Sequence, residues 1–220
     1  MVHATAVDGL KGGRLRVGMV GGGRNAFIGV VHRMAMRLDN LIQLKAGALS
    51  SDAEDAHASD ADLGLAPERT YSDHREMAAR EAARRDGIET AVIITPNHLH
   101  FPVAKAFLEA GIDFIFDKPL SATLAEASQP VERTCAKDLI FAVILNNTGY
   151  PMVRQAREMI EAGEIRDIRV VHAAYVQDWL TLPIDADGHK QAEWLTDPGR
   201  ADPPPVLPTS GPTRTVWLCS

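Results

Sequence analysis

Cysteine, aromatic residues and positive charge are all scarce in this sequence. The chain has 220 residues, of which two are cysteines and 5% are aromatic. The two cysteines, Cys135 and Cys219, make neither a disulfide framework nor a metal cluster, and the histidines show no metal-ligand spacing. The 23 basic and 29 acidic residues give a net charge of −6. This charge argues against a protein that holds nucleic acid or an anionic membrane through bulk attraction.

Long apolar segments are missing as well. The longest apolar run, residues 139–145, is far shorter than the ~20 residues that span a bilayer. The first residues contain no basic stretch followed by an apolar one, so the sequence predicts no signal peptide. Hydrophobic residues nevertheless make up 45% of the chain, which is enough for an ordinary globular core. We therefore expect a cytoplasmic globular protein with reduced thiols, without metal, nucleic-acid or membrane partners.

Short apolar segments alternate with segments of helical periodicity. We expect strands at residues 15–20, 41–49, 91–94, 113–116 and 139–145, and helices at 27–38, 53–63, 73–85, 100–110, 124–137 and 151–162. Strands that alternate with helices predict βαβ units, and strands without polar alternation predict a sheet buried on both faces. The predicted fold class is therefore α/β, with a Rossmann-type doubly wound parallel sheet.

The composition divides the chain into four parts. A polar leader over 1–13 precedes a domain over 14–145 that contains the expected parallel sheet. An alternating segment at 168–175 predicts a strand of a different sheet, so residues 146–196 are interpreted as the start of a second domain. Residues 197–220 are rich in proline and lack periodicity, so we expect them to be disordered.

The turn after the first expected strand has the pattern of a dinucleotide-binding loop. Gly21 permits a tight turn, Gly23 lets the backbone approach a pyrophosphate, and Ala26 is small enough for close helix packing. The amides at the start of the following helix would then face the anion. A glycine turn that serves packing alone is the alternative. On the dinucleotide interpretation, the cofactor-binding residues of this turn are Gly21, Gly22, Gly23, Arg24, Asn25 and Ala26.

The end of the second expected strand is the place where an acidic residue would hold the ribose of NAD. The chain has Leu49, Ser50, Ser51 and Asp52 in sequence there. Serine tolerates the additional 2′-phosphate of NADP, but no arginine stands beside it. We assign Ser50 and Ser51 to the cofactor site, and we leave the choice between NAD and NADP open. Asp52 is a candidate cap for the next helix.

Polar residues also follow the third expected strand. Because the carboxyl ends of parallel strands lie at one edge of the sheet, these residues would line the same cofactor cleft. For Asn97 and His98, an exposed helix start without a chemical role explains the sequence equally well. We expect His100 to be exposed to water near the start of its helix. The residues assigned to the cleft are Thr95, Pro96, Asn97 and His98.

Asp117, Lys118 and Pro119 follow the fourth expected strand. A lysine at the carboxyl edge of a buried sheet needs a partner or a task. Beside a nicotinamide, Lys118 would hydrogen-bond the oxygen of a reacting alcohol or carbonyl and assist proton transfer. Asp117 would orient Lys118. The alternative is a surface turn without a chemical role.

Three of these segments together resemble the Gfo/Idh/MocA family, the glucose–fructose oxidoreductase and inositol dehydrogenase group. They are Val-Gly-Met-Val-Gly-Gly-Gly at 17–23, Thr-Pro-Asn-His-Leu-His at 95–100 and Asp-Lys-Pro-Leu at 117–120. The helix expected after Tyr150 also matches, and the resemblance extends as far as Trp194. It therefore covers most of the chain.

The resemblance implies a Rossmann domain that binds NAD or NADP and a C-terminal α/β domain with a largely antiparallel sheet. It implies reversible oxidation of a secondary alcohol on a sugar, inositol or related polyol, with Lys118 as the active-site lysine. Asp117 and Pro119 would belong to the cofactor cleft, and Asn146 and Tyr150 would approach the substrate. Full-length members of the family are expected to be homo-oligomers.

The resemblance ends after Trp194. Family members continue to an Asp-x-Gly-x-His motif, whose Asp and His bind substrate and move the proton. This chain reads Pro-Thr-Ser-Gly-Pro-Thr-Arg at 208–214, which with permitted codons spells Asp-Ile-Gly-x-His-Ala in a shifted frame. We therefore hypothesise that the tail is an out-of-frame reading and that this chain lacks part of the catalytic site. The alternative function is a non-catalytic dinucleotide-binding module, and a methyltransferase on a similar sheet would have no use for Lys118.

Overall fold

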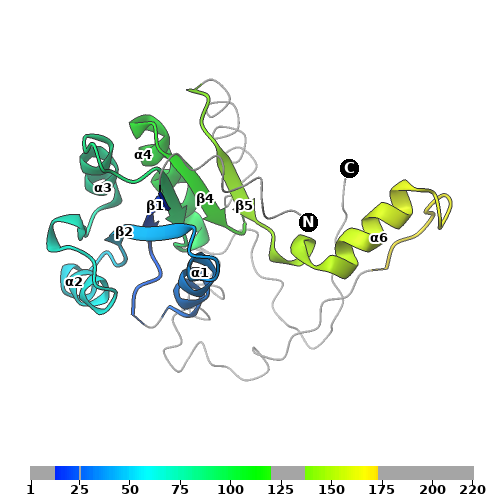
Figure 1. Cartoon of the computed structure of the whole chain (residues 1–220), viewed down its shortest axis with the longest axis horizontal. Coiled ribbons are helices and arrows are strands. Elements are labelled where there is room, and N and C mark those ends of the chain that lie inside the picture. The colour runs from blue at the N-terminus through cyan, green and yellow to red at the C-terminus, as the bar shows by residue number, and fades with distance from the viewer. Residues whose placement is uncertain (1–12, 25, 120–136, 173–220) are drawn as a thin grey trace. The chain divides into compact units, whose positions relative to one another are not determined.

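The structure is a computed structural model, shown in Figure 1, that describes residues 13–24, 26–119 and 137–172. The chain divides into two compact units, Met1–Ile144 and Leu145–Ser220. No helix within the described ranges is long and apolar enough to cross a membrane.

Several expectations fall outside the described residues. Asn25 of the glycine turn is one of them. The others are nearly all of the leader, most of the helix expected at 124–137, the second domain beyond residue 172 and the tail at 197–220. These expectations remain predictions.

The first unit is built on a five-stranded parallel sheet. The strands lie in the order β2-β1-β3-β4-β5, and every neighbouring pair is parallel. All four residues of the central strand β3 are buried, which confirms the expected sheet with two covered faces. The strands are β1 (Leu15–Val20), β2 (Ile42–Ala48), β3 (Thr90–Ile93), β4 (Asp113–Asp117) and β5 (Phe141–Ile144).

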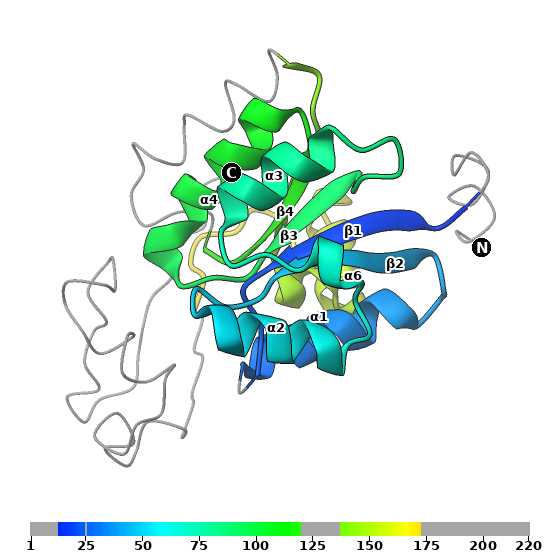
Figure 2. The same ribbon diagram turned by 90° about the vertical axis from the view of Figure 1, so that its left-hand side faces the viewer.

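Helices lie on both faces of this sheet. Figure 2 shows α3 (His74–Ala82) and α4 (Asn97–Ala110) on one face, with α1 (Phe27–Arg37) and α2 (Ala53–Asp62) on the other. A short 3-10 turn, Pro67–Arg69, lies between α2 and α3. This arrangement is the Rossmann-type doubly wound fold that the alternation of strands and helices predicts.

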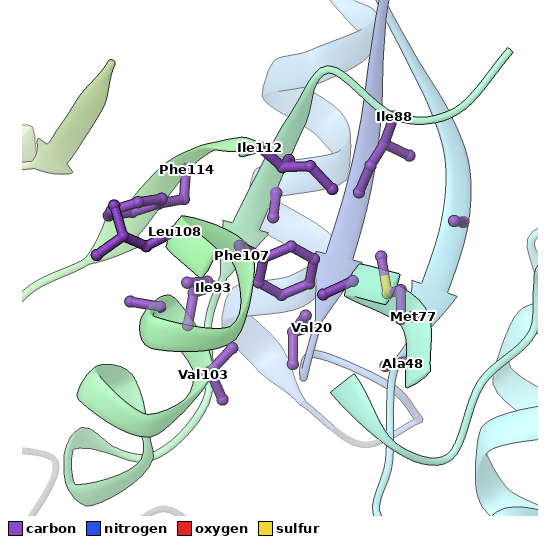
Figure 3. Packing of buried hydrophobic residues seen from close by; sticks show 14 of the residues in the cluster. Val20, Ala48, Met77, Ile88, Ile93, Val103, Phe107, Leu108, Ile112 and Phe114 are labelled. Carbon is purple, nitrogen blue, oxygen red and sulfur yellow. The ribbon is translucent and has the colours of Figure 1, made fainter. Parts of the chain in front are cut away.

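The larger hydrophobic cluster lies between the sheet and the pair α3 and α4. Val103, Phe107 and Leu108 of α4 are at most 3% exposed, and Figure 3 shows them beside Val20 and Ile93 of the strands. Full burial of a side chain of this size contributes about 1.5–3 kcal/mol. The cluster therefore holds α4 firmly against the sheet, and with it the start of α4 at the carboxyl edge.

The start of α4 differs from its prediction. The helix begins at Asn97, three residues before the expected start at His100. Pro96 is extended, with φ −55° and ψ 149°, and its carbonyl accepts a hydrogen bond from the amide of Leu99 (2.9 Å). Because the chain turns directly after Pro96, Asn97 and His98 belong to the first turn of the helix.

The second unit begins with a 3-10 turn, η2 (Asn146–Gly149), and the helix α6 (Pro151–Glu161). Pro151 occupies the first helical position, where its missing N–H is not needed. The strand expected at 168–175 is wrong for its described part, because residues 168–172 form no strand. A strand needs a neighbour, and within the described ranges no segment pairs with these residues.

Candidate functional site

The glycine loop between β1 and α1 lies between the ends of the two neighbouring strands. The amide of Gly21 donates to the carbonyl oxygen of Ala48 at the end of β2 (3.0 Å). The amide of Ile94, after β3, donates to the carbonyl oxygen of Val20 (2.9 Å). The loop is therefore fixed at the carboxyl edge of the sheet, where ligands bind in open parallel sheets.

Two glycines of this loop adopt the left-handed conformation. Gly21 has φ 82° and Gly22 has φ 76°. A Cβ on Gly21 would also lie 2.9 Å from the carbonyl oxygen of Ile94. A Cβ on Gly23 would lie 2.8 Å from the carbonyl oxygen of Leu49. Only glycine fits this turn without strain, and the turn leaves bare backbone at the edge of the sheet.

Gly29 is a position that the sequence analysis missed. It lies in α1, and a Cβ there would collide with the carbonyl oxygen of Gly22 and lie 2.7 Å from its Cα. The tight contact between loop and helix is therefore made at Gly29, whereas Ala26 is half-buried at the helix start. An isolated glycine inside the helical pattern was the available signal.

Among the described residues, no side chain caps the amides at the N-terminus of α1. Ala26 is its N-cap residue, and the first turn holds no acidic residue. At the starts of α2 and α3, by contrast, Asp52 accepts from the amide of Asp55 (2.9 Å) and Asp73 from that of Arg75 (2.6 Å). The first amides of α1 are therefore free to bind an anion, such as a diphosphate.

Arg24 is bound to α2 through its backbone and its side chain. Its amide donates to Oγ of Ser59 (3.0 Å), and its guanidinium donates twice to the carboxylate of Asp62 (2.7 and 2.8 Å). This pair lowers the pKa of Asp62 and raises that of Arg24. Because Ser59 accepts from the amide and Asp62 accepts from Nε and Nη2, Nη1 of the guanidinium is the group of Arg24 that stays a candidate for cofactor contact.

Ser50 and Ser51 follow β2 at the same edge. Oγ of Ser50 accepts from the amide of Asp52 (3.2 Å), and Ser51 is exposed. Asp52 caps α2, as the sequence suggested as one of its roles. The end of β2 thus carries hydroxyls without a dedicated acidic ribose ligand, and the choice between NAD and NADP stays open.

Thr95, Pro96, Asn97 and His98 lie between β3 and the first turn of α4. The first three are half-buried and His98 is exposed. Oγ1 of Thr95 is buried and has no hydrogen-bond partner among the described residues. A buried hydroxyl of this kind is typical of a site that water or a ligand completes.

His100 is buried, so the expectation of an exposed histidine is wrong. Its side chain is 1% exposed. Nδ1 lies 2.6 Å from the carbonyl oxygen of Pro119, and Nε2 lies 2.8 Å from that of Thr95. Burial lowers the pKa of His100, while both carbonyl contacts and the charge of Asp117 act in the opposite direction. His100 therefore joins the segment after β3 to the segment after β4.

The burial of His100 had a signal in the sequence. Val103, Ala104 and Phe107 follow it at three, four and seven residues, which is the spacing of one helix face. A second buried histidine, His32 of α1, was also missed. Burial lowers the pKa of His32, and the charge of Asp117 opposes this effect.

Lys118 lies directly after β4 with an exposed side chain. The sequence predicts a partner or a task for this lysine; because water can solvate its exposed charge, it does not need a partner, and its task remains a prediction. Oδ1 of Asp117 accepts a hydrogen bond from the backbone amide of Lys118 (2.9 Å). Asp117 thus orients the Lys118 backbone, and Pro119 continues the turn toward His100.

Asn146 and Tyr150 belong to the second unit. Nδ2 of Asn146 donates to the hydroxyl of Tyr150 (3.0 Å), and both residues are exposed. Their expected role at the substrate remains a prediction. Within the described ranges, no group of three His, Cys, Asp or Glu side chains could hold a metal ion.

The carboxyl edge fits the diphosphate of a dinucleotide. The turn at Gly21 and Gly22 is left-handed and has no room for a Cβ, and Gly21 and Gly23 on either side of the buried Gly22 are partly exposed. The uncapped amides of α1 supply donors for an anion. The unpartnered hydroxyl of Thr95 supplies a further polar group on the side of β3.

Residues 15–145 match the Gfo/Idh/MocA family, described as an oxidoreductase family with an NAD-binding Rossmann fold. The uncharacterized oxidoreductase YfiI of Bacillus subtilis (strain 168) is 40% identical over 194 residues, which cover 88% of this chain and 49% of YfiI. Levoglucosan dehydrogenase of Pseudarthrobacter phenanthrenivorans is 32% identical over 185 residues, which cover 77% of this chain and 43% of that protein. The chain therefore spans less than half the length of these curated relatives.

A solved structure is similar over the same region. It is the inositol dehydrogenase homolog from Azotobacter vinelandii, complexed with NADH and myo-inositol, with 37% identity and a TM-score of 0.76. The match covers 81% of this chain and 47% of that chain. The family match, these relatives and the parallel sheet agree with one another. The chain belongs to the Gfo/Idh/MocA family of oxidoreductases, and its first unit has the NAD-binding Rossmann fold of that family.

Proposed function

We propose that the chain belongs to an oxidoreductase that moves hydride between a secondary alcohol of a sugar, inositol or related polyol and NAD or NADP. The observation that carries this proposal is the position of Lys118. Its exposed side chain follows β4, at the sheet edge where the glycine loop and the uncapped start of α1 offer an anion site. A module that binds a dinucleotide without chemistry has no need of a lysine there.

The roles of the residues follow from their places at this edge. The amides of α1 and the turn at Gly21, Gly22 and Gly23 would hold the diphosphate. Ser50, Ser51 and the guanidinium of Arg24 would contact the adenosine ribose. Thr95 through His98, together with Asp117 and Pro119, would border the nicotinamide, which accepts or supplies the hydride when the cofactor is bound.

Lys118 would act on the oxygen of the substrate. Its Nζ would hydrogen-bond the alcohol oxygen, stabilise negative charge that develops there and assist the transfer of the hydroxyl proton. Oxidation would convert the carbinol C–H and O–H into a carbonyl, with the hydride passing to the cofactor and the proton leaving through Lys118. Asn146 and Tyr150 are proposed to approach the substrate.

The relatives support a polyol or sugar as the substrate class. One relative is named for levoglucosan, and the similar solved structure contains myo-inositol. Both names refer to molecules rich in secondary alcohols. For this chain the substrate class is therefore proposed as sugar or polyol, without a choice among them.

The proposal predicts separate effects on binding and on turnover. Lys118→Ala should bind NAD+ or NADP+ like the wild type in calorimetry, because an exposed side chain contributes little to the fold. Its turnover with a panel of polyols, followed by absorbance of the reduced nicotinamide, should fall by about 10²- to 10⁴-fold. Lys105→Ala, an exposed lysine on α4, is the matched control and should keep full turnover.

Three outcomes bear on this proposal. Dinucleotide binding without turnover in the wild type would fit both the missing Asp-x-Gly-x-His motif and a non-catalytic binding module; a chain continued in the shifted frame separates the two, because only the first regains turnover. Full turnover in Lys118→Ala would remove the lysine from the reaction. Absence of dinucleotide binding would refute the cofactor site itself.

A further inference from the structure

One buried side chain connects the two segments that carry the proposed site residues. Nδ1 of His100 lies 2.6 Å from the carbonyl oxygen of Pro119, the residue directly after Lys118. Nε2 lies 2.8 Å from the carbonyl oxygen of Thr95. Thr95 follows β3 and Pro119 follows β4, and these two strands are neighbours in the sheet. His100 therefore bridges two chain segments at the point where both leave the sheet.

Each of the two contacts pairs a ring nitrogen of His100 with a backbone carbonyl oxygen. A carbonyl oxygen can only accept a hydrogen bond, so a hydrogen bond to either one requires an N–H of the ring. A neutral imidazole has one N–H, and an imidazolium has two. Burial disfavours the charged ring, as does His98, while the carboxylate of Asp117 favours it. Burial outweighs the other influences and lowers the pKa, so the ring is neutral and the tautomer decides which nitrogen carries the proton; both nitrogens lie within hydrogen-bond distance of a carbonyl oxygen.

We propose that His100 is a positioning residue of the proposed reaction. Through the contacts of its two ring nitrogens with the Pro119 and Thr95 carbonyls, it holds the Lys118 segment against the segment that begins α4, and so keeps the lysine at the cofactor edge. This inference rests on the proposed function of Lys118. His100 itself is 1% exposed, so it acts through the backbone beside Lys118 and not on substrate or cofactor.

Asparagine and glutamine can separate the two contacts. The amide nitrogen of asparagine lies near the position of Nδ1, and that of glutamine lies near the position of Nε2. His100→Asn therefore keeps a donor for Pro119, and His100→Gln keeps a donor for Thr95. His100→Leu removes both contacts. The control is His57→Leu, which changes an exposed histidine of α2.

The quantity measured is the NMR signal of the Lys118 amine in the full chain. Reductive methylation with a ¹³C label gives each lysine an NMR signal, and Lys118→Arg assigns the signal of Lys118. We expect NAD+ to shift this signal in the wild type, in His57→Leu and in His100→Asn. We expect the shift to be lost in His100→Leu and His100→Gln, while their NAD+ affinity in calorimetry changes by less than about tenfold.

The outcomes decide the proposal in every case. It is overturned if His100→Leu folds and its Lys118 signal responds to NAD+ as in the wild type. It is also overturned if NAD+ shifts the Lys118 signal equally in His100→Asn and His100→Gln. If His100→Leu does not fold, this comparison is sufficient by itself. If the wild type does not bind NAD+, the proposed function fails by itself. In that case the Lys118 signal measured without NAD+ tests the role of His100, because this signal must still differ between His100→Asn and His100→Gln.

Discussion

Asp60, in the last turn of α2, is fully buried, and neither of its carboxylate oxygens has a hydrogen-bond partner among the described residues. Burial raises the pKa of Asp60 from its ordinary value of 3.8 to about 7, and the Thr70 side chain acts in the opposite direction. Because the pKa is higher in the folded chain, the folded state binds more protons between these two values. Stability is then highest below the lower value and falls as the pH rises toward the upper one.

Asp60→Asn should remove this loss of stability. The full difference in pKa corresponds to about 4 kcal/mol at a pH above both values. We expect the variant to unfold at higher urea than the wild type at about pH 8, and at similar urea near pH 4. The measurement is urea denaturation followed by circular dichroism across this range.

Asp62 lies on the same helix and serves as a control, because its pKa is shifted in the opposite direction from that of Asp60. Its hydrogen bonds with Arg24 lower its pKa, so its contribution to stability is present above 3.8 and is lost as the pH falls. Asp62→Asn should therefore not reproduce the gain of Asp60→Asn at high pH. A pH dependence that is the same in wild type and Asp60→Asn would contradict the assignment to Asp60.

At the scale of elements, the glycine loop and α1 depend on one close backbone contact. Gly29 lies against Gly22, and α1 begins without a capping side chain. Helix propensity alone favours alanine over glycine by about 1 kcal/mol. The colliding Cβ would nevertheless displace the loop, and overpacking of this kind costs about 1–3 kcal/mol. The contact therefore sets the position of the first amides of α1.

Gly29→Ala should lower both stability and dinucleotide affinity. We expect the free energy of unfolding to fall by up to about 2 kcal/mol, the cost of overpacking less the gain in helix propensity, and NAD+ binding in calorimetry to weaken. Gly149→Ala is the matched control, since a Cβ at Gly149 meets nothing within 4 Å and should leave both quantities unchanged. A Gly29→Ala protein that is more stable and binds normally would show that helix propensity outweighs the contact.

At the scale of the whole molecule, the proposed cofactor residues all belong to the first unit. They follow β1, β2, β3 and β4, which lie within Met1–Ile144. The proposed substrate residues Asn146 and Tyr150 belong to the second unit. Cofactor binding and substrate binding are therefore assigned to different parts of the chain.

A chain that ends at Ile144 tests this division. We expect it to retain its circular dichroism signal and to bind NAD+ with the affinity of the full chain, because its sheet and loops are intact. Polyol turnover should be absent. A folded fragment that has lost NAD+ binding would place part of the cofactor site beyond residue 144.

The sequence by itself determined the order of the elements and the edge at which the proposed site lies. Apolar strands without alternation, separated by helical periods, leave a parallel sheet as the simplest arrangement. The polar residues after each strand then lie at one edge of the sheet, so the sequence predicts that Gly21 and Lys118 lie at the same edge. These inferences need only local periodicity and the topology of βαβ units.

The tertiary structure decided the places of His100, Gly29 and Asp60. The partners of His100 are backbone carbonyls in two different loops, and the partner of Gly29 is the backbone of Gly22. The carboxylate of Asp60 is packed against Gly47 of β2, and the Thr70 side chain is the polar group that opposes its raised pKa. Side-chain type and spacing do not encode such contacts, because they arise only when the sheet has brought distant backbone segments within a few ångströms.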